Sequence, residues 1–317
     1  MDHLDKRIIC MLEQDCRISV SQMARRLRRN RNVISYRLQR LEKEHIIDRY
    51  IASVNLGKLG YNTFKVYLRL GRKEGEEGLV RWLRERKEVI HIIRLEGEYN
   101  LSCVVVARDV VALDGFLGEI RTAFTEAIRD LHVSIIVYSR IFKFEKLLLN
   151  KKEHAIKSER YSSGARSMQL DDSDRVLLKA LSQDARASYM KLVETTGLSL
   201  DMVRYRMRKL RNSVINSFRI LINMGSIGYF HHVILLRTER MTQSDEQRLV
   251  AWCTMRRNVL YCTKRIGEYD FEINVAITGI DDLRGTLSDL QADFSDIIAG
   301  QSSILLSKVE KLDYFPF

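Results

Sequence analysis

Apolar and polar positions follow a helical period in residues 18–41, and the rest of the chain is organised around this stretch. The pattern predicts two short helices joined by a tight turn. Asn30 is placed to start the second helix, because its side-chain oxygen can accept a hydrogen bond from a free first-turn N–H. Ile34, Leu38 and Leu41 fall at i, i+4 and i+7 and form one apolar stripe. This stripe predicts a buried face and leaves the opposite face to solvent.

The outward face of the second helix carries side chains that can recognise DNA. Asn, Ser and Gln side chains can hydrogen-bond to base edges in the major groove, and Arg can hold phosphates. The predicted DNA-binding residues of this helix and of the turn before it are Arg28, Arg29, Arg31, Asn32, Ser35, Tyr36, Gln39 and Arg40. Taken alone, the stretch fits an ordinary solvated amphipathic helix about equally well.

The pattern changes to a strand period after this stretch. Residues 46–55 are rich in β-formers and predict a wing, so that residues 1–60 make a winged helix-turn-helix. Further along, we predict helices at 78–86 and 111–128, and strands at 64–70, 89–95, 101–107 and 133–144. This βαββαβ order is the ferredoxin-like arrangement of two helices on one antiparallel sheet.

The whole unit then occurs a second time. VISYRLQRL at Val33 returns as MVRYRMRKL at Met202, GEYN at Gly97 returns as GEYD at Gly267, and the offset stays within 168 to 170 residues. A duplication of this length predicts an α+β protein with two copies of a two-domain unit. The predicted parts are a winged helix-turn-helix at 1–60, a ferredoxin-like domain at 61–150, a linker at 151–169, a second winged helix-turn-helix at 170–228 and a second ferredoxin-like domain at 229–317.

Composition and charge favour a polyanionic partner. The 317 residues are 45% hydrophobic, which supports real cores, and the formal net charge of +12 favours nucleic acid or an anionic membrane surface. No apolar run approaches the ~20 residues that span a bilayer, and the start of the chain is acidic and helical rather than a signal peptide. The five cysteines show no CxxC spacing and predict reduced, buried thiols in a cytoplasmic protein, with no metal site.

The two predicted heads differ in charge and in their turns. Residues 1–60 hold 13 Lys and Arg against 7 Asp and Glu, a net of +6. Arg28 stands in the first turn where the second copy has Gly197, the residue suited to a left-handed conformation. On the second head, Asp201 would repel phosphate unless it accepts from a cytosine amino group. The predicted DNA-binding residues there are Ser199, Arg204, Tyr205, Arg208 and Lys209. We therefore expect an asymmetric operator, with the first head as the stronger electrostatic anchor.

The ordered set of motifs resembles the Lrp/AsnC family, the leucine-responsive or feast/famine regulators. No single motif is specific, but the order covers nearly the whole chain twice. The family's D-x-R-x-S helix start, its R-x-x-x-L recognition helix and its G-x-x-D sensing turn correspond to residues 15–19, 37–41 and, less closely, 97–100, and to residues 184–188, 206–210 and 267–270. The resemblance implies a DNA-binding transcriptional regulator of archaeal type.

Members of this family normally pair two chains through their sensing sheets, and here two units are fused. The resemblance therefore implies a covalent pseudo-dimer, in which the linkage keeps the halves at high effective concentration. It also implies further homo-oligomerisation and a small effector, such as an amino acid, near the sensing turns. The implied effector-binding residues are Gly97, Tyr99, Asn100, Gly267, Tyr269 and Asp270. In the alternative, the glycines serve only the turn and the Asp or Asn caps it.

Two alternatives stay open. The architecture also resembles sirohaem decarboxylases of the alternative haem pathway, but their R-x-H-x-Y-N-L-W-F-T-like run is incomplete here, since Glu96 stands at the His position and the Trp-Phe pair is missing. The second alternative is a protein-interaction scaffold with a degenerate second head. No catalytic residue and no cofactor is expected: His91 fits a sheet histidine, and His231 and His232 should point to opposite faces of a strand.

Overall fold

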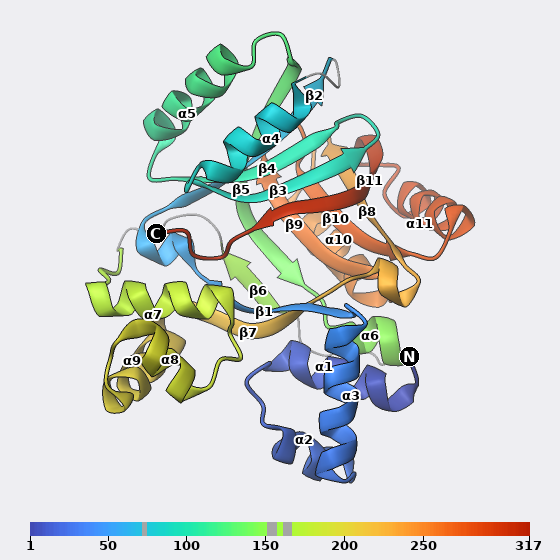
Figure 1. The fold of residues 1–317 in the computed structure, drawn as a ribbon. Helices are drawn as coiled ribbons and strands as arrows, with labels where there is room; N and C mark the ends of the chain where they lie inside the picture. The colour runs from blue at the N-terminus through green and yellow to red at the C-terminus, as the bar shows by residue number, and fades with distance from the viewer. Residues whose placement is uncertain (72–74, 151–156, 161–166) are drawn as a thin grey trace.

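The computed structural model describes residues 1–71, 75–150, 157–160 and 167–317. Two small helical heads lie at one end of the molecule, and two α+β units with joined sheets form the other end (Figure 1). Among the described residues, none of the helices has the length and apolar character that crossing a membrane would need. The two-headed arrangement and the α+β class predicted from the repeat are confirmed.

Each head is a bundle of three helices that begin at polar caps. In head one, the side chains of Asp2, Ser19 and Asn30 accept hydrogen bonds from first-turn N–H groups. Its helices are α1 (His3–Gln14), α2 (Val20–Leu27) and α3 (Arg31–Lys43). Head two repeats them as α7 (Asp172–Gln183), α8 (Tyr189–Thr196) and α9 (Leu200–Ser213). The apolar stripe predicted on the second helix of the turn is confirmed, because Ile34, Leu38 and Leu41 are all buried.

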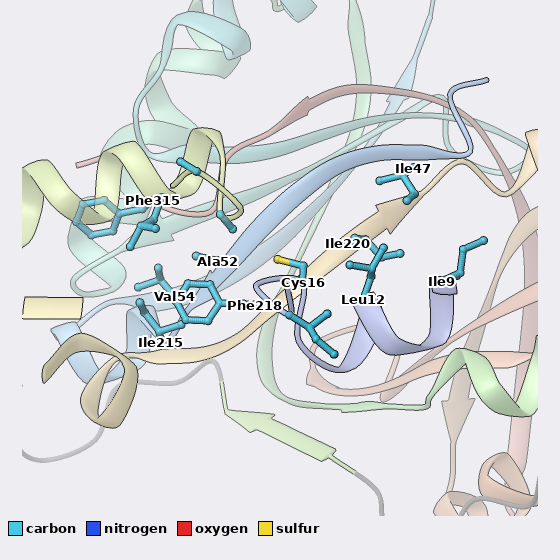
Figure 2. Packing of buried hydrophobic residues seen from close by; sticks show 14 of the residues in the cluster. Ile9, Leu12, Cys16, Ile47, Ala52, Val54, Ile215, Phe218, Ile220 and Phe315 are labelled. Atoms are coloured by element: carbon cyan, nitrogen blue, oxygen red, sulfur yellow. The ribbon is translucent and has the colours of Figure 1, made fainter. Parts of the chain in front are cut away.

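The strands that follow the heads pair with each other. β1 (Ile47–Val54) and β7 (Ile215–Ile222) form an antiparallel two-stranded sheet. Helix α1 contacts β7 and helix α7 contacts β1, so each head packs on the strand of the other copy. Figure 2 shows Leu12 and Cys16 of head one lying beside Phe218 and Ile220 of β7. The two heads therefore share one continuous apolar core.

Each ferredoxin-like unit has the predicted βαββαβ order. The first consists of β2 (Asn62–Leu70), α4 (Glu76–Glu85), β3 (Val89–Glu96), β4 (Leu101–Ala107), α5 (Val110–Ala123) and β5 (Ile128–Ile141). The second consists of β8 (Phe230–Thr238), α10 (Gln243–Met255), β9 (Val259–Ile266), β10 (Phe271–Ile277), α11 (Ile280–Asp293) and β11 (Ile298–Leu312). Short turns η1 (Leu56–Leu59) and η2 (Gly225–Ile227) connect the heads to these units.

The two four-stranded sheets close into one ring of eight antiparallel strands. Strand β5 pairs with β2 of its own unit through its first half and with β9 of the other unit through its second half. Strand β11 does the same with β8 and β3. The helices of each unit cover the outer face of its sheet, over separate apolar cores. The inner faces meet around a smaller cluster that includes Tyr67, Tyr99 and Leu235.

Two predicted boundaries differ from the structure. The helix expected at 111–128 ends at Ala123, and β5 already begins at Ile128, because the last strand is long enough to reach both sheets. The chain after β5 forms α6 (Phe144–Leu149), which packs against α1. Most of the expected linker at 151–169 lies outside the described residues, but β6 (Lys157–Arg160) pairs with the end of β5. None of the five cysteines forms a disulfide and all are buried, as predicted.

Candidate nucleic-acid interface

Helix α3 presents the polar face that the sequence predicts. Its first turn is capped by Asn30, whose Oδ1 accepts from the Asn32 N–H at 2.8 Å. The Tyr36 side chain is 66% exposed, so packing against a neighbouring helix does not account for it. All eight predicted residues of this head are exposed or half-exposed on or just before α3: Arg28, Arg29, Arg31, Asn32, Ser35, Tyr36, Gln39 and Arg40.

The turn before α3 contains a strained residue. Arg28 follows α2 with φ 53° and ψ 50°, a left-handed conformation that costs an L-residue with a Cβ free energy. The equivalent turn of head two carries Gly197 at φ 69°, where this cost is absent. The two turns therefore have similar backbone conformations. In head one the strained residue, Arg28, places an exposed guanidinium beside the recognition helix.

A buried carboxylate holds the recognition helix of each head. Asp5 on α1 is fully buried and binds two arginines of α3, Arg37 at 3.0 Å and Arg40 at 2.6 Å. In head two, Asp174 binds Arg206 at 2.8 Å and Lys209 at 2.6 Å. These contacts orient the third helix against the first. Arg40 and Lys209, both predicted to contact DNA, are thus half-exposed partners of a buried acid.

The acids at these two positions were not assigned a role from the sequence. The only signal there is their repetition at an offset of 169 residues on an otherwise apolar face. A charged residue on such a face is rarely buried without a partner, and this makes a pairing with a basic residue of another helix the expected solution.

The recognition face of head two differs from that of head one. Ser199 caps α9 by accepting from the Met202 N–H at 3.3 Å. Asp201 is almost completely exposed at the start of the helix and lies 3.7 Å from Arg204. Tyr205 is 63% exposed, like its counterpart in head one. Arg208 is also exposed, so this face holds both charges where head one holds only positive ones.

Reciprocal hydrogen bonds tie the two heads together. Arg17 donates from Nη1 to the carbonyl of Ala185 at 2.7 Å, and Arg186 donates to the carbonyl of Cys16. Each arginine belongs to the D-x-R-x-S segment of its own head and reaches the same segment of the other head. The two recognition helices are consequently held in one relative orientation around a pseudo-twofold axis.

The sensing turns also meet across this axis. The Tyr99 hydroxyl donates to Glu268 at 3.3 Å, and the Tyr269 hydroxyl donates to Glu98 at 3.0 Å. Burial raises the pKa of Tyr269, as does its bond to Glu98, so this hydroxyl stays protonated at neutral pH. Gly267 lies tightly against β5, where an added Cβ would come within 2.6 Å of the Cβ of Ser134.

The polar residue that ends each turn caps a strand. Asn100 accepts from the Leu70 N–H at 2.7 Å, and Asp270 accepts from the N–H and hydroxyl of Thr238 at 2.7 and 2.9 Å. The six residues of the implied effector site are therefore brought together as two turns facing each other's units. A hollow of about 500 Å³ lies beside the second turn, lined among others by Asp270, Lys264 and Glu246.

Comparisons with known proteins agree with this geometry. Residues 1–48 match a winged helix-turn-helix DNA-binding family, and residues 170–211 match the AsnC-type helix-turn-helix domain. The regulator Ptr1 of Methanocaldococcus jannaschii is 26% identical over 119 residues, which are 38% of this chain and 80% of Ptr1. The regulator AldR of Mycobacterium tuberculosis is 26% identical over 159 residues, which are 49% of this chain and 88% of AldR.

The chain is similar to Lrp/AsnC-type regulators, and its second head matches the AsnC-type helix-turn-helix domain. Each relative aligns over most of its own length and less than half of this chain, so there is room here for two family units. The crystal structure of the siroheme decarboxylase NirDL is similar over 98% of this chain and 93% of its own, with a TM-score of 0.65 and 9% identity. At that identity the likeness shows the fold alone. It supports the arrangement of two similar units in one chain.

Proposed function

We propose that this protein is a transcriptional regulator that binds DNA with both heads at once, as a covalent pseudo-dimer. The observation that carries the proposal is the pair of exposed recognition faces on α3 and α9, at the same end of the molecule (Figure 1). Paired wing strands and the bonds of Arg17 and Arg186 fix the two faces relative to each other. A fixed pair of helices suits two half-sites on one face of DNA, roughly 10 bp or a multiple apart.

The heads have unequal parts in this proposal. In head one, positive residues and hydrogen-bonding side chains surround the start of α3, which suits phosphate contacts and base contacts together. Head two places the exposed Asp201 at the same position, where it favours a cytosine amino group over phosphate. We infer that head one anchors the complex and that head two discriminates between sequences. The half-exposed Arg40 and Lys209 add positive potential from behind the face.

The deciding experiment is a binding titration of the purified protein on DNA from its own upstream region, against random DNA, at two salt concentrations. A regulator should bind its operator more tightly than random DNA. Its affinity should also fall steeply with salt, and the slope then counts the phosphates contacted. Weak binding that is equal on both DNAs would contradict the proposal.

Three substitutions test the assignment of the recognition face. Arg31→Ala or Gln39→Ala should weaken operator binding by about one order of magnitude, whereas Asp201→Ala should have a smaller effect or none. Lys87→Ala is the matched control, because Lys87 is an exposed lysine in the turn between α4 and β3, outside the heads. If all three variants bind like the parent and the control, the recognition helix is wrongly assigned.

We also propose that a small effector, such as an amino acid, acts at the second sensing turn. The hollow beside Asp270 supports this, since the Asp270 carboxylate lines it and a carboxylate can bind the ammonium group of a small zwitterion. Lys264 and Glu246 line the same hollow as an ion pair with each other. Asp270→Asn is a conservative test, because Asn100 caps the equivalent strand in the first unit. Calorimetry against single amino acids should show binding to the parent and a loss of about tenfold in this variant. If the parent and Asp270→Asn bind amino acids with equal affinity, Asp270 only caps the strand and does not bind an effector.

Higher assembly and location complete the proposal. Val110 and Ile280 begin α5 and α11 at equivalent places in the two units and are 64% and 61% exposed, and Val111 beside Val110 is 76% exposed, which suits further pairing through the sensing domains. Light scattering of the parent and of a Val111→Asp variant tests this pairing. The absence of disulfides among the five cysteines is in keeping with a reducing, cytoplasmic environment.

A tetrapyrrole enzyme is the second candidate function, and the similarity to NirDL over nearly the whole chain is the observation that favours it. The position of the usual histidine is taken by the exposed Glu96, and the Arg94 side chain beside it is bound by Glu77 and Glu310. Addition of sirohaem with absorbance detection tests this candidate. A shifted Soret band, followed by loss of carboxylate groups from the pigment, would show that the protein is a tetrapyrrole enzyme and would contradict the proposal of a regulator.

A further inference from the structure

A cavity of about 850 Å³ lies inside the ring of strands, at the end that faces the heads. Its walls come from both units, and β1 and β7 border it on the side of the heads through Arg49 and Arg219. Farther from the heads, the interior is filled by Tyr67, Tyr99 and Leu235. Protein interiors normally leave few voids larger than a water molecule. A space of this size inside the ring of strands therefore suggests that a ligand binds there.

Buried polar atoms in the cavity wall lack partners. Thr63 is 1% exposed, and within the part of the chain that the structure describes neither its Oγ1 nor the buried Nε2 of His91 has a hydrogen bond. Burial lowers the pKa of His91 to about 3, with the charge of Lys65 acting in the same direction, so the ring is neutral at physiological pH. A neutral imidazole and a hydroxyl can both donate a hydrogen bond to a ligand.

The cavity also contains a buried cation without a hydrogen-bond acceptor among the described residues. Lys65 is 7% exposed, and burial lowers its pKa. The nearby carboxylate of Glu272 is already occupied, since it accepts from Tyr67 at 2.8 Å and from Asn274 at 2.9 Å. Burial raises the pKa of Glu272, but the charges of Lys65 and Arg265 outweigh this effect and bring it to about 2. An anionic group entering the cavity would therefore meet the Lys65 ammonium group without displacing an existing ion pair.

These groups lie close together. Lys65 of β2 and His91 of β3 both pair with Val104 on the strand between them. Two positions farther along β4, Val106 pairs with Thr63. A single carboxylate or sulfonate could thus be reached from one wall of the cavity by the ammonium group, the imidazole and the hydroxyl.

The rest of the lining is largely apolar. Ile90, Ile93, Val104, Ile136 and Phe144 surround the same space. Ligand sites of proteins typically measure ~300–1,000 Å³ and combine such apolar walls with a few polar groups that fix orientation. The volume is several times that of a free amino acid, so the occupant needs a sizeable apolar body.

We propose that this cavity is a binding site for an organic anion with an apolar body, larger than a free amino acid. The anionic group lies at Lys65, where Thr63 and His91 add hydrogen bonds, and the body packs against the isoleucines. The site is separate from the recognition helices and from the sensing turns. It goes beyond the regulator function and does not depend on it, because binding needs no DNA.

A matched pair of fluorescent probes tests the proposal on the intact chain. 8-Anilino-1-naphthalenesulfonate carries a sulfonate, and N-phenyl-1-naphthylamine has the same aromatic body without charge. The sulfonate should bind at one site per chain, at least tenfold more tightly than the neutral probe. Equal affinities for the two probes, or no saturable binding of the sulfonate, would overturn the assignment.

Substitutions locate the probe. Lys65→Met should weaken the sulfonate at least tenfold and leave the neutral probe within about twofold, whereas Val104→Phe should weaken both probes because it fills the space. Lys87→Met, an exposed lysine outside the cavity, is the control and should change neither. Parent-like sulfonate binding by both Lys65→Met and Val104→Phe would overturn the site. Circular dichroism of each variant confirms its fold, and Ile136→Phe replaces any filling variant that does not fold.

Discussion

At the scale of single residues, the two turns of the heads offer an internal comparison of backbone strain. Arg28 and Gly197 both adopt left-handed conformations, but only the glycine does so without steric cost. Arg28→Gly should raise the free energy of unfolding of head one by about 0.5–1 kcal/mol, and Gly197→Ala should lower that of head two by about 1 kcal/mol. Denaturant unfolding measures both changes.

The same Arg28→Gly variant should bind DNA more weakly, because it removes a positive charge beside α3. A shallower salt dependence, by about one phosphate contact, is the expected signature. Open space surrounds Gly197, so Gly197→Ala changes backbone preference alone and serves as the control. If Arg28→Gly is less stable than the parent, the turn is not strained and the left-handed conformation has no cost there.

His91 gives the stability of the protein a dependence on pH. Its pKa is lowered from the usual 6.5 to about 3 by burial, so below pH 6.5 the unfolded chain binds a proton that the folded chain does not. The contribution is fully present above pH 6.5 and is lost as the pH falls toward 3. Between pH 6.5 and pH 5 the loss is about 2 kcal/mol.

Replacement by a side chain of similar shape that does not titrate tests this contribution. His91→Phe should remove about 1–2 kcal/mol of the difference in unfolding free energy between pH 7 and pH 5. Chemical denaturation at the two pH values gives the difference directly. An unchanged pH dependence in His91→Phe would mean that other groups carry it.

At the scale of elements, the buried acids Asp5 and Asp174 decide where the recognition helices lie. Asp5→Asn keeps the shape of the side chain but removes the buried anion that Arg37 and Arg40 share, and leaves them with the more exposed Asp2 and Glu44. We expect a loss of about 1–3 kcal/mol in stability, less than the ~3–5 kcal/mol for a fully buried ion pair, because both arginines are partly exposed. Asp174→Asn should act on head two in the same way, and thermal unfolding of the two variants measures the loss.

The Asp5→Asn variant should also bind the operator more weakly than the parent, although Asp5 lies away from the recognition face. The reason is that α3 loses its fixed orientation against α1. Glu44 is a half-exposed partner of the same Arg40, 3.7 Å away, so Glu44→Gln is the control that removes a surface ion pair in place of the buried one. Full operator affinity in Asp5→Asn would show that packing of Ile34 and Leu38 orients the helix without the ion pair.

The elements themselves were largely predictable from the sequence, but their partners were not. Apolar periodicity located α3 and the strands β2 to β4, because each of these buries one face within its own unit. It gave no sign that β1 would pair with β7, or that β5 would extend to β9, because these pairings join residues far apart in the chain. The length of β5 was missed for the same reason.

For the candidate site residues, the sequence predicted which side chains are exposed, but it did not predict which groups they bind. Polar character placed Arg31, Tyr36 and Gln39 correctly on the outside. The capping role of Asp270 stood as an alternative from the start, because an Asp after a glycine turn fits both a cap and a ligand. The cavity had no signature, since Thr63, Lys65 and His91 lie on different strands or at alternate positions and meet only in the closed sheet.

At the scale of the whole molecule, the cavity and the heads share a wall. Strands β1 and β7 border the cavity through Arg49 and Arg219, and on their other side they pack against α7 and α1. We expect an occupant that fits one position of these strands better than another to shift the heads toward the orientation that goes with it. Ligand binding in the cavity would then be coupled to DNA binding, and the coupling would be reciprocal.

This coupling predicts that a saturating amount of the naphthalenesulfonate probe changes operator affinity at least threefold. The measurement is a DNA titration with and without the probe at constant ionic strength, since the probe is itself a salt. Competition of the probe for the recognition face would also lower affinity, so the Val104→Phe variant decides between the two causes. Its filled cavity should leave operator affinity insensitive to the probe. An equal effect in that variant would place the probe on the heads, and an unchanged affinity in the parent would mean that the paired wing strands are too rigid to transmit occupancy.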